Sequence, residues 1–396
     1  MTDLAFCRVG FEGKAFVVQG LWTLNYQYIL FQMRSIGFNT IRMPFTNQFL
    51  RDQGNVSGVN YALNPDLVGL SPLECLDRII AYCGQIGLSV ILTRSSAKVD
   101  LNQTEILWYI PGDRYYTDAR FVSDWVMVAK RYVNTAVVAV DLWNAPKRNA
   151  TWGTGSISTD WNTAAERAGN AIIEANPNLL VIVAGIVWAG DLTGVLAQPV
   201  KLSSRNKLVY SVHMNPDSCK IGTVTANSTY LEKLRARWNE YFGFITIQQI
   251  APVIVSSFAT VNNFAWLSSF LDYTNGEYIT AGKSELPAGQ VGMGWSFDSI
   301  GPYGECGGLY KNDWKTLENK KIESLKPFFA PLIRMVGLKP GNRSYIVPQP
   351  SWQPTAVPSQ PLFSYFHTSG NQIVDRNGNP IRLSGMNWYN YVVVMI

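Results

Sequence analysis

Residues 72–93, Pro-Leu-Glu-Cys-Leu-Asp-Arg-Ile-Ile-Ala-Tyr-Cys-Gly-Gln-Ile-Gly-Leu-Ser-Val-Ile-Leu-Thr, contain the unit that decides the fold. Apolar side chains recur at helical spacing on one face of 72–86, at Leu76, Ile79, Ile80 and Cys83. Gly87 is a typical helix stop, and the short apolar run 89–93 that follows is typical of a buried strand. The stretch therefore predicts a helix over 72–86 followed by a strand over 89–93.

The same alternation of helix and strand continues along most of the chain. Further strands are expected at 40–43, 137–143, 180–184, 207–212, 252–255 and 293–297, with a weaker one near residues 4–6. Helices are expected at 119–132 and 160–175, the second with Asp160 as its N-cap. Eight such units predict an α/β fold, a (β/α)8 TIM barrel. A doubly wound sheet is the alternative, but no Gly-rich phosphate loop follows any strand, and no cofactor is indicated.

The composition excludes several classes of protein. Lys and Arg number 33 against 28 Asp and Glu, giving a net charge of +5, and charged residues make up only 15% of the chain. With 47% hydrophobic residues, a disordered chain, a coiled coil and a collagen-like repeat are excluded. The small basic excess forms no run, which argues against nucleic acid as a partner. Aromatic residues reach 13%, which fits either a sugar-binding surface or a large packed core.

Targeting and metal-binding signals are weak in this sequence. The N-terminus lacks the basic and apolar regions of a signal peptide, and no run of about 20 apolar residues predicts a membrane span. The cysteines, Cys7, Cys75, Cys83, Cys219 and Cys306, are scattered without paired spacing. Neither a metal site nor a disulfide framework is therefore expected.

The composition changes at Lys339. Residues 339–361 are rich in proline and predict an extended linker between a barrel module, 1–338, and a second segment, 362–396. In that segment, alternating runs flank Asn377-Gly378, which predicts a hairpin. Because residues 6–12 already fit a first strand, we interpret 362–396 as the opening hairpin and first strand of a truncated second module. A gene-prediction artefact and a permuted chain, whose tail completes the first barrel, are the alternatives.

Four strand ends carry recognisable motifs: 39–45 Asn-Thr-Ile-Arg-Met-Pro-Phe, 140–146 Val-Asp-Leu-Trp-Asn-Ala-Pro, 210–213 Tyr-Ser-Val-His and 295–297 Trp-Ser-Phe. With them, residues 4–335 resemble glycoside hydrolase family 5, the cellulase-like retaining β-glycosidases, and 370–391 resemble the start of the same family. The resemblance implies an active site at the C-terminal ends of the strands. It also implies a β-linked glucan or related polysaccharide as ligand and an extracellular location.

The resemblance places the two catalytic glutamates at positions that hold other residues here. A retaining glycosidase needs two carboxyl groups about 5 Å apart. The acid/base position, in the motif that normally reads Asn-Glu-Pro, is Ala145, and the nucleophile position is Ser257. Neither side chain can perform the reaction. The family pattern is also lost at Ser95, Lys147 and Asn215.

Four residues of the pattern remain. The resemblance implies that Arg42 orients the nucleophile, Asn144 contacts a sugar hydroxyl, His213 positions the sugar and Trp295 forms a platform below it. Each has a structural alternative: an ion pair of Arg42 with Asp141, backbone hydrogen bonds for Asn144, and core packing for His213 and Trp295.

These residues support three hypotheses about function. The leading one is a barrel of β-glucan hydrolase ancestry that is hydrolytically inactive or severely impaired. The alternatives are a carbohydrate-binding pseudoenzyme or decoy, and an O-glycosyl hydrolase with relocated carboxylates. Candidates for such carboxylates are the acids of the strand-end loops, Asp217, Asp298 and Glu305.

Overall fold

A computed structural model describes residues 19–54, 56–98, 105–147, 149–215, 228–261, 263–302, 306–330 and 365–388. Eight parallel strands form a closed barrel in the order β1-β11-β7-β6-β5-β4-β3-β2. Their bounds are β1 Thr40–Thr46, β2 Ser89–Ser96, β3 Val137–Asp141, β4 Leu180–Ala184, β5 Leu208–His213, β6 Val253–Phe258, β7 Gly294–Phe297 and β11 Ser384–Asn387. The predicted (β/α)8 barrel is confirmed.

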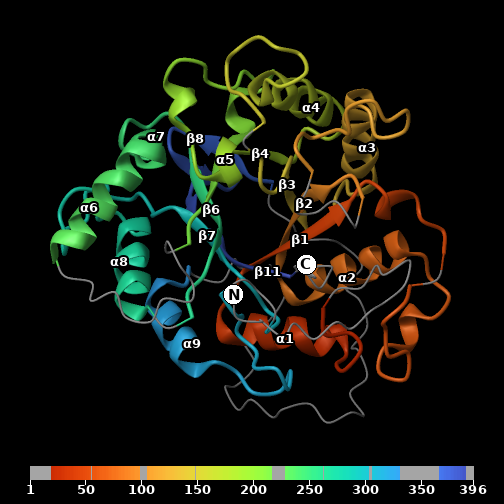
Figure 1. Cartoon of the computed structure of the whole chain (residues 1–396). Helices are drawn as coiled ribbons and strands as arrows, with labels where there is room; N and C mark the ends of the chain where they lie inside the picture. The colour runs from red at the N-terminus through yellow and green to blue at the C-terminus, as the bar shows by residue number, and fades with distance from the viewer. Residues whose placement is uncertain are drawn as a thin grey trace, which may run out of the picture.

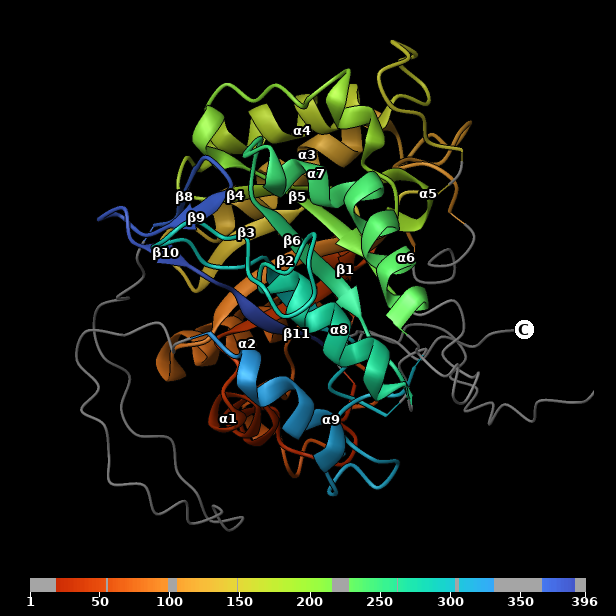
Figure 2. The same ribbon diagram turned by 90° about the vertical axis from the view of Figure 1, so that its left-hand side faces the viewer.

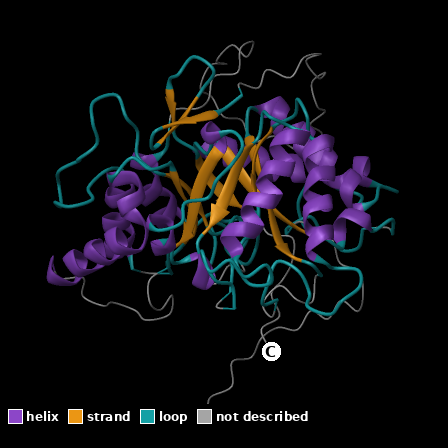
Figure 3. Cartoon of the chain, turned by 90° about the horizontal axis from the view of Figure 1, so that it is seen from above, coloured by secondary structure: helices purple, strands orange, loops and turns teal. Residues whose placement is uncertain are grey.

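Helices surround the barrel on its outside (Figures 1 and 3). Their bounds are α1 Tyr26–Ile36, α2 Pro72–Ile86, α3 Asp118–Arg131, α4 Trp161–Ala175, α5 Ile186–Ala189, α6 Ser228–Trp238, α7 Phe244–Ile247, α8 Phe264–Thr274 and α9 Asn319–Leu325. The cap signals read from the sequence act as expected. Asp160 accepts from the Asn162 backbone at the start of α4, and Gly87 ends α2 in the left-handed region at φ 75°.

The aromatic residues serve mainly the core. Eight of the 13 tryptophans are among the largest fully buried side chains: Trp108, Trp125, Trp143, Trp161, Trp266, Trp295, Trp314 and Trp388. Edge-to-face contacts such as that of Trp143 with Trp161, whose ring centroids lie 5.3 Å apart, connect the barrel to its helices. The core interpretation of the aromatic composition therefore accounts for most of the tryptophans.

The C-terminal segment completes this barrel. Strand β11 lies between β1 and β7 and pairs in parallel with both, with Thr40 opposite Gly385 and Trp295 opposite Ser384. Asn39 fixes the register, because its side chain accepts from the Ser384 backbone and donates to Arg382. This corrects the interpretation of 384–387 as part of a separate module: the strand occupies the position of the permuted alternative. Without β11, β1 and β7 would each present unpaired backbone groups.

The hairpin before β11 covers the end of the barrel where the strands begin. β8 His367–Ser369, β9 Gln372–Val374 and β10 Pro380–Ile381 form an antiparallel sheet, which confirms the predicted hairpin. Figure 2 shows this sheet on the side opposite α5. Phe366, Ile373 and Leu383 share one apolar cluster with the barrel residues Ile91 and Ile254. The expected first strand at 6–12 lies outside the described residues.

One cysteine differs from the expectation. Cys306 is disulfide-bonded, whereas Cys75 and Cys83 carry free, buried thiols. Sequence spacing offered no sign of this disulfide, because the cysteines lack the paired spacing of a disulfide framework.

Candidate active site

The retained and substituted motif residues gather at the C-terminal ends of the strands. Arg42 comes from β1, Asn144 and Ala145 follow β3, His213 ends β5 and Ser257 lies in β6. Because all eight strands run parallel, these ends meet at one mouth of the barrel. The structure therefore brings together residues that lie up to 215 positions apart in the sequence.

A buried ion pair crosses the interior of the mouth. Arg42 Nη2 lies 2.6 Å from Asp141 Oδ2, and both side chains are almost fully buried. The same guanidinium donates to Thr93 Oγ1 at 3.0 Å and to Asn144 Oδ1 at 2.7 Å. Burial raises the pKa of Asp141, although the charge of Arg42 opposes that shift. The structural alternative for Arg42, a pair with Asp141, is thus confirmed.

The C-terminal strand contributes a residue to this network. Asn387 Oδ1 accepts from Arg42 Nη1 at 3.3 Å and from Ser296 Oγ at 3.1 Å, and its amide donates to the Ser256 carbonyl. Sequence reasoning did not place Asn387 in the site. The resemblance of 370–391 to a first barrel strand could have placed Asn387 in the site. The proline-rich linker before this segment led us to assign it to a second module instead.

Ala145 and Ser257, the positions that the resemblance assigns to the catalytic carboxylates, both lie in this mouth. Ala145 is buried, and Asn144 is held beside it by its backbone donation to the Arg94 carbonyl. Ser257 is also buried, and its Oγ donates to Asp298 Oδ2 at 3.2 Å. The structure thus brings Asp298, one of the three candidate relocated acids, next to the nucleophile position. Asp217 and Glu305 lie outside the described residues.

Two of the other departures from the family pattern, Ser95 and Asn215, form hydrogen bonds within the rim. Ser95 Oγ donates to the Phe45 carbonyl at 2.9 Å, and Asn215 Oδ1 accepts from the Ala259 backbone at 3.0 Å. Both side chains therefore join neighbouring strand ends, β1 with β2 and β5 with β6. These bonds stabilise the rim of the barrel.

His213 is held in the neutral form. Its Nε2 is buried and forms no hydrogen bond with any described residue. Burial, followed by the positive charges of Arg42 and Lys147, lowers the pKa of His213 well below its usual value. The imidazole is therefore uncharged at neutral pH and retains one unused ring nitrogen.

Trp295 does not face the mouth. Its ring is 1% exposed and packs against Phe38, Phe258 and Phe329, the last stacked at 5.8 Å. Alternation along β7 turns Ser296 toward Asn387 inside the barrel and Trp295 outward, toward the helices. The prediction of a sugar platform at Trp295 is corrected, because neither face of the ring is free for a ligand.

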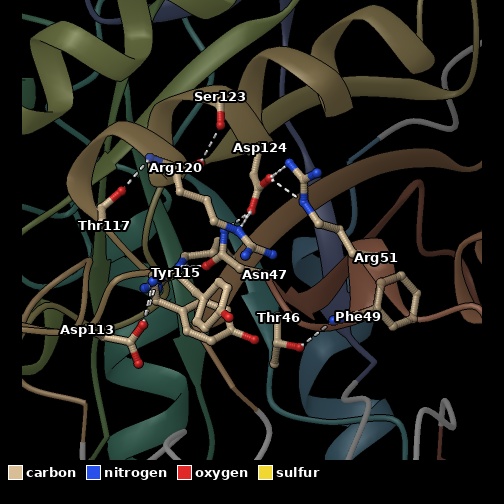
Figure 4. Close-up of polar contacts among 12 residues, drawn as sticks. Thr46, Asn47, Phe49, Arg51, Asp113, Tyr115, Thr117, Arg120, Ser123 and Asp124 are labelled. Atoms are coloured by element: carbon tan, nitrogen blue, oxygen red, sulfur yellow. Dashed lines mark hydrogen bonds and ion pairs between the residues drawn. The ribbon is translucent and has the colours of Figure 1, made fainter.

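A second polar network supports the rim beside β1 and β2. Arg94 pairs with Glu105 through two hydrogen bonds of 2.6 and 2.8 Å and donates to Asn47 at 2.8 Å. Asn47 in turn donates to Asp124, which also accepts from Arg51 and Arg120 (Figure 4). Sequence reasoning found neither Glu105 nor Asp124, since no motif marks them. Their carboxylates are committed to these partners.

Lys147 and Trp188 form a cation–π pair on the β3–β4 side of the mouth. Lys147 Nζ lies 3.7 Å from the centroid of the Trp188 ring. The Lys147 side chain is only 8% exposed, and burial lowers its pKa to about 8, opposed by the charge of Glu105. Among the described residues, its ammonium group has no ion pair and no hydrogen bond. Trp188 is 45% exposed, and its backbone donates to the Pro146 carbonyl.

Metal and membrane signals were also sought in the described residues. Within these ranges, no three His, Cys, Asp or Glu side chains are arranged to hold a metal ion. No helix of the described chain is both long and apolar enough to span a bilayer.

Comparisons with known proteins agree with the fold and with the family resemblance. The sequence model of the family described as cellulase (glycosyl hydrolase family 5) matches residues 8–281. An endoglucanase of Paenibacillus polymyxa is 34% identical over 82% of this chain and 82% of its own length. The major extracellular endoglucanase of Xanthomonas campestris pv. campestris is 28% identical over 81% of this chain and 66% of its own.

Solved structures give the same result. The catalytic domain of the major Xanthomonas campestris endoglucanase superposes with a TM-score of 0.69 at 28% identity, covering 81% of this chain and 92% of that chain. An endocellulase of Pyrococcus horikoshii in complex with cellotetraose superposes with a TM-score of 0.68 at 28% identity, covering 79% and 88%. With a family match over most of its length, this chain belongs to glycosyl hydrolase family 5, the cellulase family.

Proposed function

We propose that this barrel binds β-linked glucan chains at its mouth and hydrolyses them very slowly or not at all. One observation supports the proposal: the sequence has Ala145 and Ser257 at the positions where the family resemblance places the two catalytic carboxyl groups. Neither can donate a proton or attack an anomeric carbon at an ordinary rate. Because Arg42 and Asn144 of the family pattern are retained, we expect the barrel mouth to keep its capacity to bind sugars.

The nearby carboxylates support the loss of activity. Asp141 is tied to Arg42, and Glu105 is tied to Arg94. Each is buried and held by its partner, so neither is placed to exchange protons with a substrate. Asp298 is close to the nucleophile position, but one carboxylate alone cannot complete the two-carboxylate mechanism.

A second candidate function rests on that same Asp298. Its contact with Ser257 Oγ would allow a relocated carboxylate to act at the anomeric centre, as in a hydrolase with displaced catalytic groups. Hydrolysis at an ordinary rate that Asp298→Asn abolishes would favour this candidate over the first.

Two measurements test the main proposal. Isothermal titration with cellotetraose reports binding, and reducing-end release from a soluble β-1,4-glucan reports hydrolysis. We expect binding heat, with hydrolysis slower by about 10²-fold or more than in an active family 5 endoglucanase, because general acid–base help alone is worth that factor. Release at the rate of the active enzyme would overturn the proposal, as would the absence of heat at millimolar ligand.

We further propose an extracellular location. The disulfide of Cys306 is typical of proteins that mature in an oxidising compartment. One of the relatives is described as a major extracellular endoglucanase. Detection of the protein in the culture medium, compared with washed cells, tests this location.

A further inference from the structure

Among the residues that the structure describes, the cation Lys147 lies at the mouth of the barrel without a local counter-ion. Arg42 is compensated by Asp141, and Arg94 by Glu105, at 2.6 Å in each case. Lys147 has no such partner among the described residues, although its side chain is only 8% exposed. Glu105 attracts it from a distance, but both oxygens of that carboxylate already accept from Arg94. A buried ammonium group without an ion-pair partner is energetically unfavourable, because burial removes much of its hydration.

The segment 187–189 places the Trp188 ring against Lys147. Val187, Trp188 and Ala189 have φ values of 55°, 62° and 59°, in the left-handed region that non-glycine residues rarely adopt. A hydrogen bond joins this segment to the loop that follows β3, since the Trp188 backbone donates to the Pro146 carbonyl at 2.6 Å. The indole therefore lies over Lys147 at 3.7 Å while keeping 45% of its own surface exposed. Strain of this kind is retained where surrounding structure enforces it, often at ligand sites.

Lys147 changes the balance of charge in the barrel mouth. It lies two residues after Ala145, where the family resemblance places a glutamate. With neither glutamate present, the negative charge expected in the mouth is reduced by two, while Lys147 adds a positive charge. Asp298, the remaining acid beside Ser257, follows β7, and β7 lies opposite β3 in the eight-stranded order. The β3–β4 side of the mouth is therefore the positive side.

We propose that Lys147 and Trp188 form a subsite for an acidic sugar residue, a uronate unit within a β-linked glycan. The indole face stacks on the apolar face of the sugar ring, and the ammonium group pairs with the sugar carboxylate. The sugar carboxylate supplies a counter-ion that Lys147 does not find within the described part of the chain. This inference rests on the proposed glycan-binding function and deepens it, since it names the class of sugar.

Titration calorimetry at low salt tests the subsite with two ligands of equal length, cellotetraose and a β-1,4-linked glucuronic acid tetramer. We expect the acidic tetramer to bind about tenfold more tightly, the effect of one hydrogen-bonded charge pair. Lys147→Met should remove this preference and leave neutral cellotetraose binding in place, which shows that the variant is folded. Lys147→Arg should keep most of the preference.

Lys98 offers a matched control. It also lies over an aromatic ring, that of Tyr116 at 5.2 Å, but it is more exposed and has Asp113 as an ion-pair partner at 3.8 Å. Lys98→Met should leave the preference unchanged. Equal affinity of the two tetramers for the wild type, or a preference that survives Lys147→Met, would overturn the subsite while leaving glycan binding standing. Failure of both tetramers to bind would overturn both proposals.

Discussion

Arg42 Nη2 lies 2.6 Å from Asp141 Oδ2 inside the barrel, in a pair that links β1 to β3 and excludes solvent from both charges. In a family whose chemistry uses two glutamates, this arginine pairs with a buried aspartate on β3. The pair also holds Asn144 and reaches Asn387 on the C-terminal strand. Several expectations about stability and function follow from these contacts.

The ion pair should be sensitive to the loss of one partner. Arg42→Met leaves Asp141 buried without its counter-charge, so we expect the free energy of unfolding to fall by about 3–5 kcal/mol. Urea unfolding followed by circular dichroism measures the change. Arg131→Met is the matched control, because its pair with Asp77 is partly exposed and should cost less than about 1 kcal/mol. Equal losses in the two variants would contradict the structural role given to Arg42.

Strand β11 should be required for the stability of the barrel. Trp388, which follows it, is fully buried and donates through Nε1 to the Gln19 carbonyl. Trp388→Ala should therefore cost about 3–5 kcal/mol by cavity formation, whereas Ile157→Ala, at a 75% exposed side chain, should stay within about 0.5 kcal/mol. Deleting 365–396 should abolish cooperative unfolding. If the deletion left the transition intact, the tail would belong to a separate module.

Restoring the carboxylates should recover trace hydrolysis. The double variant Ala145→Glu, Ser257→Glu supplies an acid and a nucleophile at the two family positions, while either single variant supplies one. A glutamate at 257 would meet Asp298, which now accepts from Ser257 Oγ at 3.2 Å, and like charges at that distance disfavour ionisation. Adding Asp298→Asn should therefore increase turnover further. Reducing-end release measures each step, and activity in a single variant equal to the double would contradict this division of roles.

His213 should make the fold less stable in mild acid. Its pKa is lowered well below 6.5 in the folded state, so the unfolded chain binds the proton more readily. The neutral imidazole therefore makes its full contribution to the free energy of unfolding above pH 6.5, and this contribution is lost as the pH falls toward the pKa of the folded state. His213→Gln should show a shallower loss of melting temperature between pH 7 and 5 than the wild type. Parallel profiles would contradict the assignment.

The preference for an acidic glycan should weaken as the pH rises above neutral. Burial lowers the pKa of Lys147 to about 8, while Glu105 attracts its charge and the neighbouring His213 is neutral. The ammonium group therefore loses its proton above this value, and the tighter binding of the glucuronic acid tetramer should decline between pH 7 and 9. Lys147→Arg should remove this dependence, since arginine stays charged. Titration calorimetry across the range decides the outcome.

The sequence by itself determined most of the helices and strands, and it is the source of the proposal that the catalytic carboxylates are replaced. Helical periodicity over 72–86, the cap Asp160 and the run 180–184 all reflect local forces, and the structure places each element within a few residues of its predicted bounds. The proposed substitutions at Ala145 and Ser257 were also read from the sequence, because that assignment depends on motif position alone.

Tertiary structure decided the rest. The strand register determines the direction in which the Trp295 side chain points. The open edges of β1 and β7 determine where β11 pairs. The proline-rich stretch before the tail carries no information about pairing across more than 340 residues between Asn39 and Ser384. That Lys147 has no ion-pair partner in the described ranges likewise depends on Arg94, which binds both carboxylate oxygens of Glu105. Local sequence encodes propensity and periodicity, whereas these features depend on which distant groups compete for the same partner in space.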